Sequence, residues 1–144
     1  MRAGEFADLG ARRSGLQFGD ASARSNAELS FKQNYIGDRG IIPVADVLQH
    51  KDKLKTINLA GNGIRNRGVH ALVEVCKFHP SLTSIDLSNN YISQHGSLDL
   101  LEMLRTNPRI VSLDFSGNPI DAALRLKLRM ALERNQTGKS RTEG

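Results

Sequence analysis

Two acidic residues at matching places in the sequence are the first candidates for chemistry. Asp86 and Asp114 lie 28 residues apart, so a regular fold would place their carboxylates side by side. Calcium takes roughly six to eight oxygen ligands, and two carboxylates without further ligands make a weak site. The sequence therefore predicts no metal and no other cofactor. We interpret the pair as part of a solvated, mildly acidic face that could attract a basic partner.

Nucleophiles and general bases are also poorly placed for catalysis. The single cysteine, Cys76, falls among the apolar positions of an expected helix, which favours a buried thiol. Histidines 50, 70, 79 and 95 accompany no cysteine or carboxylate cluster, and no serine, histidine and acid are spaced to converge as a triad. We therefore predict a non-enzymatic protein. One cysteine cannot form a disulfide within the chain, which favours a reducing compartment, the cytoplasm, with a cytoskeletal association as an option.

A regular repeat must position these residues. Asparagines occur at positions 34, 62, 90 and 118, so each interval is 28 residues. Apolar residues share this interval, in columns such as Leu29, Ile57, Ile85 and Leu113, or Ile36, Ile64, Ile92 and Ile120. Self-similarity of this kind indicates a repeat architecture. It predicts four repeats, over residues 26–53, 54–81, 82–109 and 110–135.

The apolar spacing changes within each repeat. Ile57 and Leu59 are two residues apart, which is typical of one face of a strand, whereas Leu72 and Cys76 show the four-residue spacing of a helix. Each repeat is thus predicted to contain a short strand, a turn, a helix and a return loop. Crossovers of equal length make successive strands parallel. The expected fold is thus a repeated α/β unit with parallel strands.

The repeated asparagines are expected to be structural. An amide side chain carries both donors and an acceptor, so it can satisfy backbone groups that a turn leaves unpaired. Stacked at the repeat interval, Asn34, Asn62, Asn90 and Asn118 should form a ladder along one edge of the solenoid. A buried polar group without a partner costs about 1–3 kcal/mol. We therefore predict that replacing Asn62 or Asn90 damages the fold rather than a binding site.

Polar residues and glycines suggest where the helices begin. Asp38, Asn66, Ser93 and Asp121 precede the expected helices and suit the N-cap position. Glycines 40, 68 and 96 occupy places where a helix should approach its neighbour closely. Proline 43 cannot donate a helical hydrogen bond, so we expect the first helix to start late, with this proline in its first turn.

The combined pattern resembles the leucine-rich repeat. The form L-x-x-L-x-L-x-x-N-x-L, followed by a helical glycine and further leucines, is carried by Leu54–Cys76 and Leu82–Leu104. The 28-residue length is similar to that of the ribonuclease-inhibitor-like subclass. The resemblance covers about residues 26–135. It implies a short right-handed α/β solenoid, a horseshoe segment with parallel strands on the concave face and helices on the convex face. It also implies protein binding.

The positions between the buried strand residues form the candidate binding surface, because alternate side chains of a strand point to opposite faces. We predict that a partner protein contacts these positions on the concave face: Thr56, Asn58, Ser84, Asp86, Ser88, Ser112 and Asp114. Tyr35 and Tyr91 follow the turn asparagines of the first and third repeats. They are interpreted either as aromatic anchors at the rim of this face or as passive cover for a neighbouring turn.

The two ends of the chain do not follow the repeat. Residues 1–25 are expected to be flexible, with a short part that could cover the end of the core, and residues 136–144 to form a disordered tail. The last helix, predicted over residues 122–134, is interpreted as a C-terminal cap. Self-association or partner binding through the terminal repeats is the alternative, because a terminal repeat has no following neighbour.

Composition narrows the classes of function further. The net charge of +5 is spread along the chain, which argues against nucleic-acid binding, and no apolar run is long enough to span a membrane. A non-enzymatic interaction scaffold is the leading hypothesis. One alternative, a GTPase activator of the Ran-activator type, would use Arg65 or Arg67 to stabilise transition-state charge. Another alternative is a structural component of the cytoskeleton or flagellum.

Overall fold

Strands and helices alternate through residues 27–143, the part of the chain that the computed structural model describes, with side chains through residue 138. The strands are β1 (Glu28–Ser30), β2 (Thr56–Asn58), β3 (Ser84–Asp86) and β4 (Ser112–Asp114). The helices are α2 (Gly37–Gln49), α3 (Asn66–Cys76), α4 (Gln94–Thr106) and α5 (Ala122–Glu143). The segment expected to be flexible, residues 1–25, lies outside the described residues.

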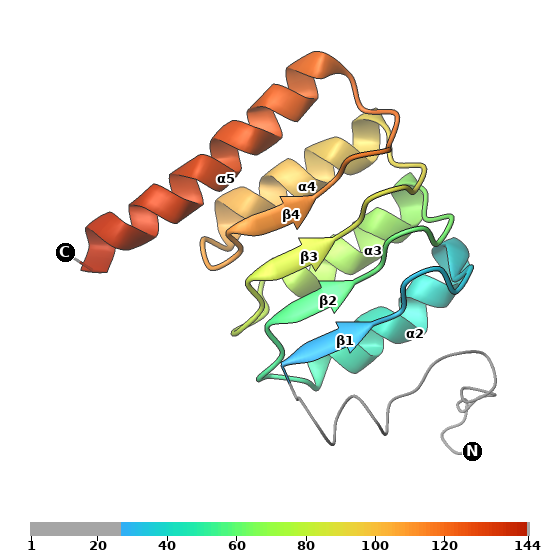
Figure 1. The fold of residues 1–144 in the computed structure, drawn as a ribbon. Coiled ribbons are helices and arrows are strands. Elements are labelled where there is room, and N and C mark those ends of the chain that lie inside the picture. The colour runs from blue at the N-terminus through green and yellow to red at the C-terminus, as the bar shows by residue number, and fades with distance from the viewer. Residues whose placement is uncertain (1–26, 144) are drawn as a thin grey trace.

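The four strands form one parallel sheet in the order β1-β2-β3-β4. Their register follows the sequence repeat, so that Ile57 lies between Leu29 and Ile85. Figure 1 shows the sheet as one layer and the helices as a second layer on one of its faces. Packed helices need about 8–10 Å each, whereas neighbouring strands need about 4.8 Å, so the sheet lies on the inner side of the curve. The predicted short α/β solenoid is confirmed.

An aliphatic core fills the space between the two layers. The strand residues Ile57 and Ile85 and the helix residues Leu72 and Leu100 are each at most 1% exposed. Two phenylalanines, Phe31 in the first repeat and Phe115 in the last, are also buried. Since each repeat buries its strand against its own helix and against its neighbours, the sheet is held as a rigid surface.

The polar residues expected to cap their own helices bond to the next repeat instead. The Asp38 carboxylate accepts from the backbone N–H of Arg65 at 2.7 Å, and the Asn66 Oδ1 accepts from the N–H groups of Ser93 and Gly96, both at 2.9 Å. The capping prediction for Asp38 and Asn66 was therefore wrong. Both residues lie inside the first turn of their own helices, where their side chains reach across to the neighbouring helix start.

At the fourth helix start, the capping prediction agrees with the structure. Asp121 lies directly before α5, and its Oδ1 accepts from the N–H of Leu124 at 2.8 Å. Ser93 occupies the N-cap position of α4 without a side-chain capping bond. Its hydroxyl accepts from the Asn66 Nδ2 at 2.8 Å instead.

Helix α2 begins earlier than expected. It starts at Gly37, so Pro43 lies in its interior rather than in its first turn. Proline deprives the carbonyl four residues earlier, that of Arg39, of its helical partner. Both Arg39 and Pro43 are exposed, so this interruption lies on the solvent side of the helix, where water can hydrate the carbonyl.

Helix α5 extends further than expected. It runs to Glu143 and so includes most of the segment that was predicted to be a disordered tail. Two side chains tie the helix to the body at this point. The Nδ2 of Asn135 donates to the carbonyls of Leu104 and Ile110, and the Nε2 of Gln136 donates to the carbonyl of Val111 at 2.7 Å. Sequence composition gave no sign of these bonds.

Candidate functional site: the strand face and its rim

Two rows of polar side chains cross the sheet on the face opposite the core. The register pairs Thr56 with Ser84 and Ser84 with Ser112 in one row, and Asn58 with Asp86 and Asp86 with Asp114 in the other. We call these six residues the strand face. The residues on β2 and β3 are partly exposed, whereas Ser112 and Asp114 on the outer strand β4 are exposed. The strand face is thus a regular polar surface on a rigid support.

The two aspartates of the strand face are held by the turns that follow them. The Oδ1 of Asp86 accepts from the N–H of Ser88 at 2.9 Å and from its hydroxyl at 2.7 Å. Asp114 accepts the same two bonds from Ser116, at 3.0 and 2.7 Å. Each carboxylate therefore carries its negative charge in a fixed position, with no partner for its Oδ2 among the described residues.

Ser88 is the one predicted contact residue that the structure does not present to solvent. It is 7% exposed and its hydroxyl points to Asp86. Ala60, one repeat earlier, is buried as well, whereas Ser116 in the last repeat is exposed. The alternation of side chains along a strand predicted that Ser88 lies on the exposed face of the sheet. The chain already turns at this residue, however. Ala60 and Ser88 lie in the middle repeats, where neighbouring repeats cover them.

Two exposed tyrosines lie in the loops that lead from a strand to the next helix, Tyr35 between β1 and α2 and Tyr91 between β3 and α4. Tyr35 is 90% exposed and Tyr91 is 60% exposed, and we call this pair the tyrosine rim. Tyr35 has a φ of 54°, in the left-handed region that disfavours residues with a side chain, while the second repeat has Gly63 at the same position, with a φ of 71°. The guanidinium of Arg65 lies 5.7 Å from the centroid of the Tyr91 ring. The tyrosine rim thus combines exposed rings with a cation.

The turn asparagines form a continuous hydrogen-bond ladder. The Oδ1 of Asn90 accepts from the N–H groups of Asn62 and Ile64 at 2.9 and 3.0 Å. Its Nδ2 donates to three carbonyls, those of Leu59, Leu87 and Ser88, at 3.0–3.2 Å. Asn90 is 3% exposed, so these groups have no access to water. The side chain therefore joins two repeats rather than offering itself to a ligand.

The other ladder members show how far this arrangement extends. Asn62 accepts from the N–H of Asn34 at 2.8 Å, and Asn118 accepts from the N–H of Ile92 at 2.9 Å. Asn34 itself is only partly buried, and its side chain has no hydrogen-bond partner among the described residues. The side chains of the ladder are thus hydrogen-bonded in the middle repeats, whereas the side chain of its first member, Asn34, has no partner among the described residues.

A second polar ladder, which the sequence reasoning missed, lies in the return loops. The Nε2 of His79 lies 3.1 Å from the carbonyl of Leu48, and the Nδ2 of Asn107 donates to the carbonyls of Cys76 and His79. Asn135 continues the series at the start of the helix extension. His79, Asn107 and Asn135 are each at most 6% exposed. Their 28-residue spacing was the available signal, but the change of residue type from one repeat to the next hid it.

His79 is held as a neutral ring. A carbonyl can only accept, so the Nε2 carries the proton that is donated to Leu48, while the Nδ1 accepts from the N–H groups of Ser81 and Leu82 at 3.2 and 3.1 Å. Burial is the main cause that lowers the pKa of His79 below its ordinary value of 6.5. A second proton, on the Nδ1, would point at the N–H groups of Ser81 and Leu82, so protonation of the ring is disfavoured.

A pH dependence of stability follows from this histidine. Because its pKa is lower in the folded chain than in the unfolded chain, its contribution is fully present above pH 6.5 and is lost as the pH falls through the lowered pKa. We expect the free energy of unfolding, measured in urea, to fall between about pH 7.5 and 5. His79→Asn, which adopts the residue type of Asn107, should show a shallower fall. Equal slopes for both proteins would exclude His79 as the source.

The remaining candidates for reactive chemistry are not assembled into a site. The Cys76 thiol is fully buried, and burial raises its pKa to about 12, so the thiolate is not formed near neutral pH. Within residues 27–138, no three side chains of histidine, cysteine, aspartate or glutamate gather in a way that could hold a metal ion. Over the same described part of the chain, no helix is both long enough and apolar enough to cross a membrane.

Comparison with known families matches the repeats directly. Two family models, both described as the leucine-rich repeat, match residues 50–73 and 81–103. Together with the parallel sheet and the asparagine ladder, these matches identify the chain as a leucine-rich repeat protein. Families of this type are generally non-enzymatic. No curated protein sequence matches the chain.

Two solved structures share the fold at low sequence identity. The actin-binding site 2 of leiomodin-1 superposes with a TM-score of 0.67 at 16% identity, covering 81% of this chain and 84% of that one. The tropomodulin C-terminal domain of Caenorhabditis elegans gives a TM-score of 0.54 at 13% identity, covering 81% of this chain and 88% of that one. At these identities the likeness shows the fold alone.

Proposed function

We propose that the chain is a protein-binding scaffold whose contact surface combines the strand face with the tyrosine rim. The observation that supports this most is Tyr35, an aromatic residue that is 90% exposed and lies in a left-handed backbone conformation. Such a conformation costs roughly 1–2 kcal/mol for a residue with a side chain. The ring adds nothing to the core, so folding does not explain it. Exposed tyrosines are typical anchors of protein interfaces.

The strand face would supply the polar part of the same contact. Its fixed carboxylates, Asp86 and Asp114, would favour basic groups on the partner, whereas the Arg65 guanidinium over Tyr91 would favour an acidic or aromatic group at the rim. The rigid repeats reduce the entropy lost on binding. We also assign the repeats to the ribonuclease-inhibitor-like subclass, on the basis of their 28-residue length and regular helices.

The proposal predicts that binding and stability respond separately at Tyr35. Tyr35→Gly adopts the residue found at Gly63, so relief of backbone strain and the greater freedom of the unfolded chain should roughly cancel, leaving the melting temperature nearly unchanged. Capture of partner proteins from native cell extract should be lost, and chemical cross-links in the parent complex should map to the rim. Phe78→Ala is the matched control, because Phe78 is 71% exposed and lies outside the rim.

Substitutions on the strand face sharpen the same test. Ser84→Lys is preferred to a change at Asp86, because Asp86 holds its own turn whereas the Ser84 hydroxyl makes no hydrogen bond within the described residues. Ser84→Lys should weaken capture without loss of stability. If both Tyr35→Gly and Ser84→Lys retain the partner fully, the contact lies elsewhere and the proposal is wrong.

A cytoskeletal partner is the second candidate, and the fold shared with the actin-binding site 2 of leiomodin-1 favours it. It would agree with a cytoplasmic location of the protein. Co-sedimentation with filamentous actin is the direct measurement. Pelleting that Tyr35→Gly abolishes and Phe78→Ala preserves would name actin as the partner, while no pelleting of the parent protein would exclude filaments. The GTPase-activator alternative, which would use Arg65 or Arg67, is not favoured by either of the two solved structures reported above.

A further inference from the structure

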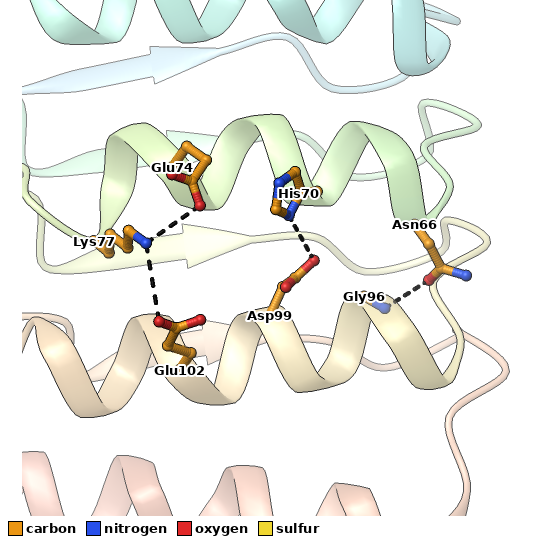
Figure 2. Close-up of polar contacts among 7 residues, drawn as sticks. All are labelled: Asn66, His70, Glu74, Lys77, Gly96, Asp99 and Glu102. Carbon is orange, nitrogen blue, oxygen red and sulfur yellow. Dashed lines mark hydrogen bonds and ion pairs between the residues drawn. The ribbon is translucent and has the colours of Figure 1, made fainter.

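The contacts between α3 and α4 show which face of a helix packs against the helix of the next repeat. Figure 2 shows that His70 of α3 and Lys77, the residue that follows α3, point toward α4, where they meet Asp99 and Glu102. The His70 Nδ1 lies 3.2 Å from the Asp99 Oδ2, and the Lys77 Nζ lies 3.9 Å from the Glu102 Oε2. Acidic groups of the following helix thus face basic groups of the preceding one.

On α5, no described residue of another element covers the corresponding face. Two repeats after His70 and Lys77, the repeat interval places Leu126 and Glu133 on this face of α5. A shallow groove of about 450 Å³ runs along it, and its walls are residues of α5 alone: Leu126, Arg129, Met130, Leu132, Glu133 and Gln136. Leu126 and Met130 are 55% and 57% exposed. We call this surface the α5 groove.

The α5 groove differs from an interior helix face that has merely lost its neighbour. At the position of Arg129, the earlier helices have the buried apolar residues Ala45, Val73 and Leu101. Residues 122–138 carry four basic side chains and a single acidic one, Glu133. Neither Arg129 nor Arg134 makes an ion pair within the described residues. On this face of α5 a charged residue, Arg129, therefore takes the place of a buried apolar residue. Two large apolar side chains, Leu126 and Met130, remain exposed beside it.

We propose that the α5 groove binds an acidic amphipathic helix of a partner protein, in the place that a fifth repeat helix would take. The apolar side of such a helix would cover Leu126 and Met130, as is usual for a helix bound in a groove. Its flanking carboxylates would pair with Arg129 in the groove and with Arg134 outside its lining, as Asp99 and Glu102 pair with His70 and Lys77. A second copy of this chain fits less well, because it would bring another basic α5 and a further net charge of +5.

This second surface is independent of the strand face and the tyrosine rim. All of its residues lie on α5, which Figure 1 shows next to α4 at one end of the row of helices. A scaffold with both surfaces could hold two partners at once. Substitutions in the α5 groove therefore leave the proposed contact through Tyr35 unchanged.

The test uses a designed helical peptide with leucines at helical spacing, flanked by glutamates, and a matched peptide with lysines in their place. In fluorescence anisotropy at low salt, we expect the acidic peptide to bind the full chain and the basic peptide to bind much more weakly, with the difference reduced by added salt. Combined Leu126→Glu and Met130→Glu should weaken binding of the acidic peptide by at least about tenfold. Arg129→Glu should shift the preference toward the basic peptide.

Two controls keep the result interpretable. Phe78→Glu alters another exposed apolar residue, 71% exposed in the loop that follows α3, and should leave peptide binding unchanged. Tyr35→Gly should do the same, so failure here and failure of the proposed rim contact are separate outcomes. Equal binding of both peptides would overturn the proposal. So would sedimentation of the parent chain as a dimer that the Leu126 and Met130 changes dissolve, because the groove would then belong to a second copy.

Discussion

Asn90→Ala is expected to lower the free energy of unfolding by on the order of 3–5 kcal/mol. The change removes the acceptor of the Asn62 and Ile64 N–H groups and the donor to three carbonyls, all at a side chain that is 3% exposed. Two N–H groups would be left buried without partners, at about 1–3 kcal/mol each. The cavity left by the missing amide adds to this loss. Urea unfolding followed by circular dichroism measures the change.

Asn34→Ala is the matched control, since it removes the same side chain from the open end of the ladder. The Asn34 amide is only partly buried and bonds to no described residue, so a loss below about 1 kcal/mol is expected. The difference between the two variants isolates the hydrogen bonds from any general preference for asparagine in these turns. Similar losses at both positions would show that the ladder is not what holds the middle repeats.

Much of the fold could be predicted from the sequence because a single interval of 28 residues relates all four repeats. Residues of one column meet the same surroundings in every repeat, so Leu29, Ile57 and Ile85 identify each other as core positions. Departures from this regularity were harder to foresee. The bonds from Asp38 and Asn66 cross to the next repeat, and a pattern within one repeat contains no information about such contacts between repeats.

The candidate site was predicted less completely than the fold. Alternation along a strand correctly gave the rows that contain Ser84 and Asp86, because side chains in a strand must alternate. Alternation ceases where the backbone turns, which is why Ser88 is buried. The left-handed conformation of Tyr35 was also not predictable, since a tyrosine in a sequence gives no sign of a positive φ. The feature that best supports a binding surface therefore required the structure.

The contacts between repeats separate two groups of residues. Residues that bond to the next repeat, such as Asn66 and Asn90, are buried or partly buried and set the spacing of the repeats. Residues outside these contacts, such as Tyr35 and Leu126, are exposed and make no contribution to that spacing. Substitutions in the first group should alter stability, and substitutions in the second group should alter binding.

Gly96→Ala is expected to destabilise the chain by about 2–4 kcal/mol, despite the better helix propensity of alanine. A Cβ at this position would lie 2.6 Å from the Oδ1 of Asn66 and 2.8 Å from the Cγ2 of Ile92. Neither neighbour can move away easily. Asn66 is held by the N–H group of Ser93 and by that of Gly96 itself, the second of which Figure 2 shows, and Ile92 is fully buried. Pushing Asn66 aside would also release the N–H groups at the start of α4.

Gly138→Ala provides a control with the opposite expected sign. Gly138 lies in α5, and a Cβ added there would meet no atom within 4 Å. Only helix propensity then changes, which should stabilise the chain by up to about 1 kcal/mol. Thermal unfolding of the two variants should therefore displace the midpoint in opposite directions from the parent. A loss at Gly138 or a gain at Gly96 would contradict the view that close approach between helices, rather than helix propensity, determines where this chain requires glycine.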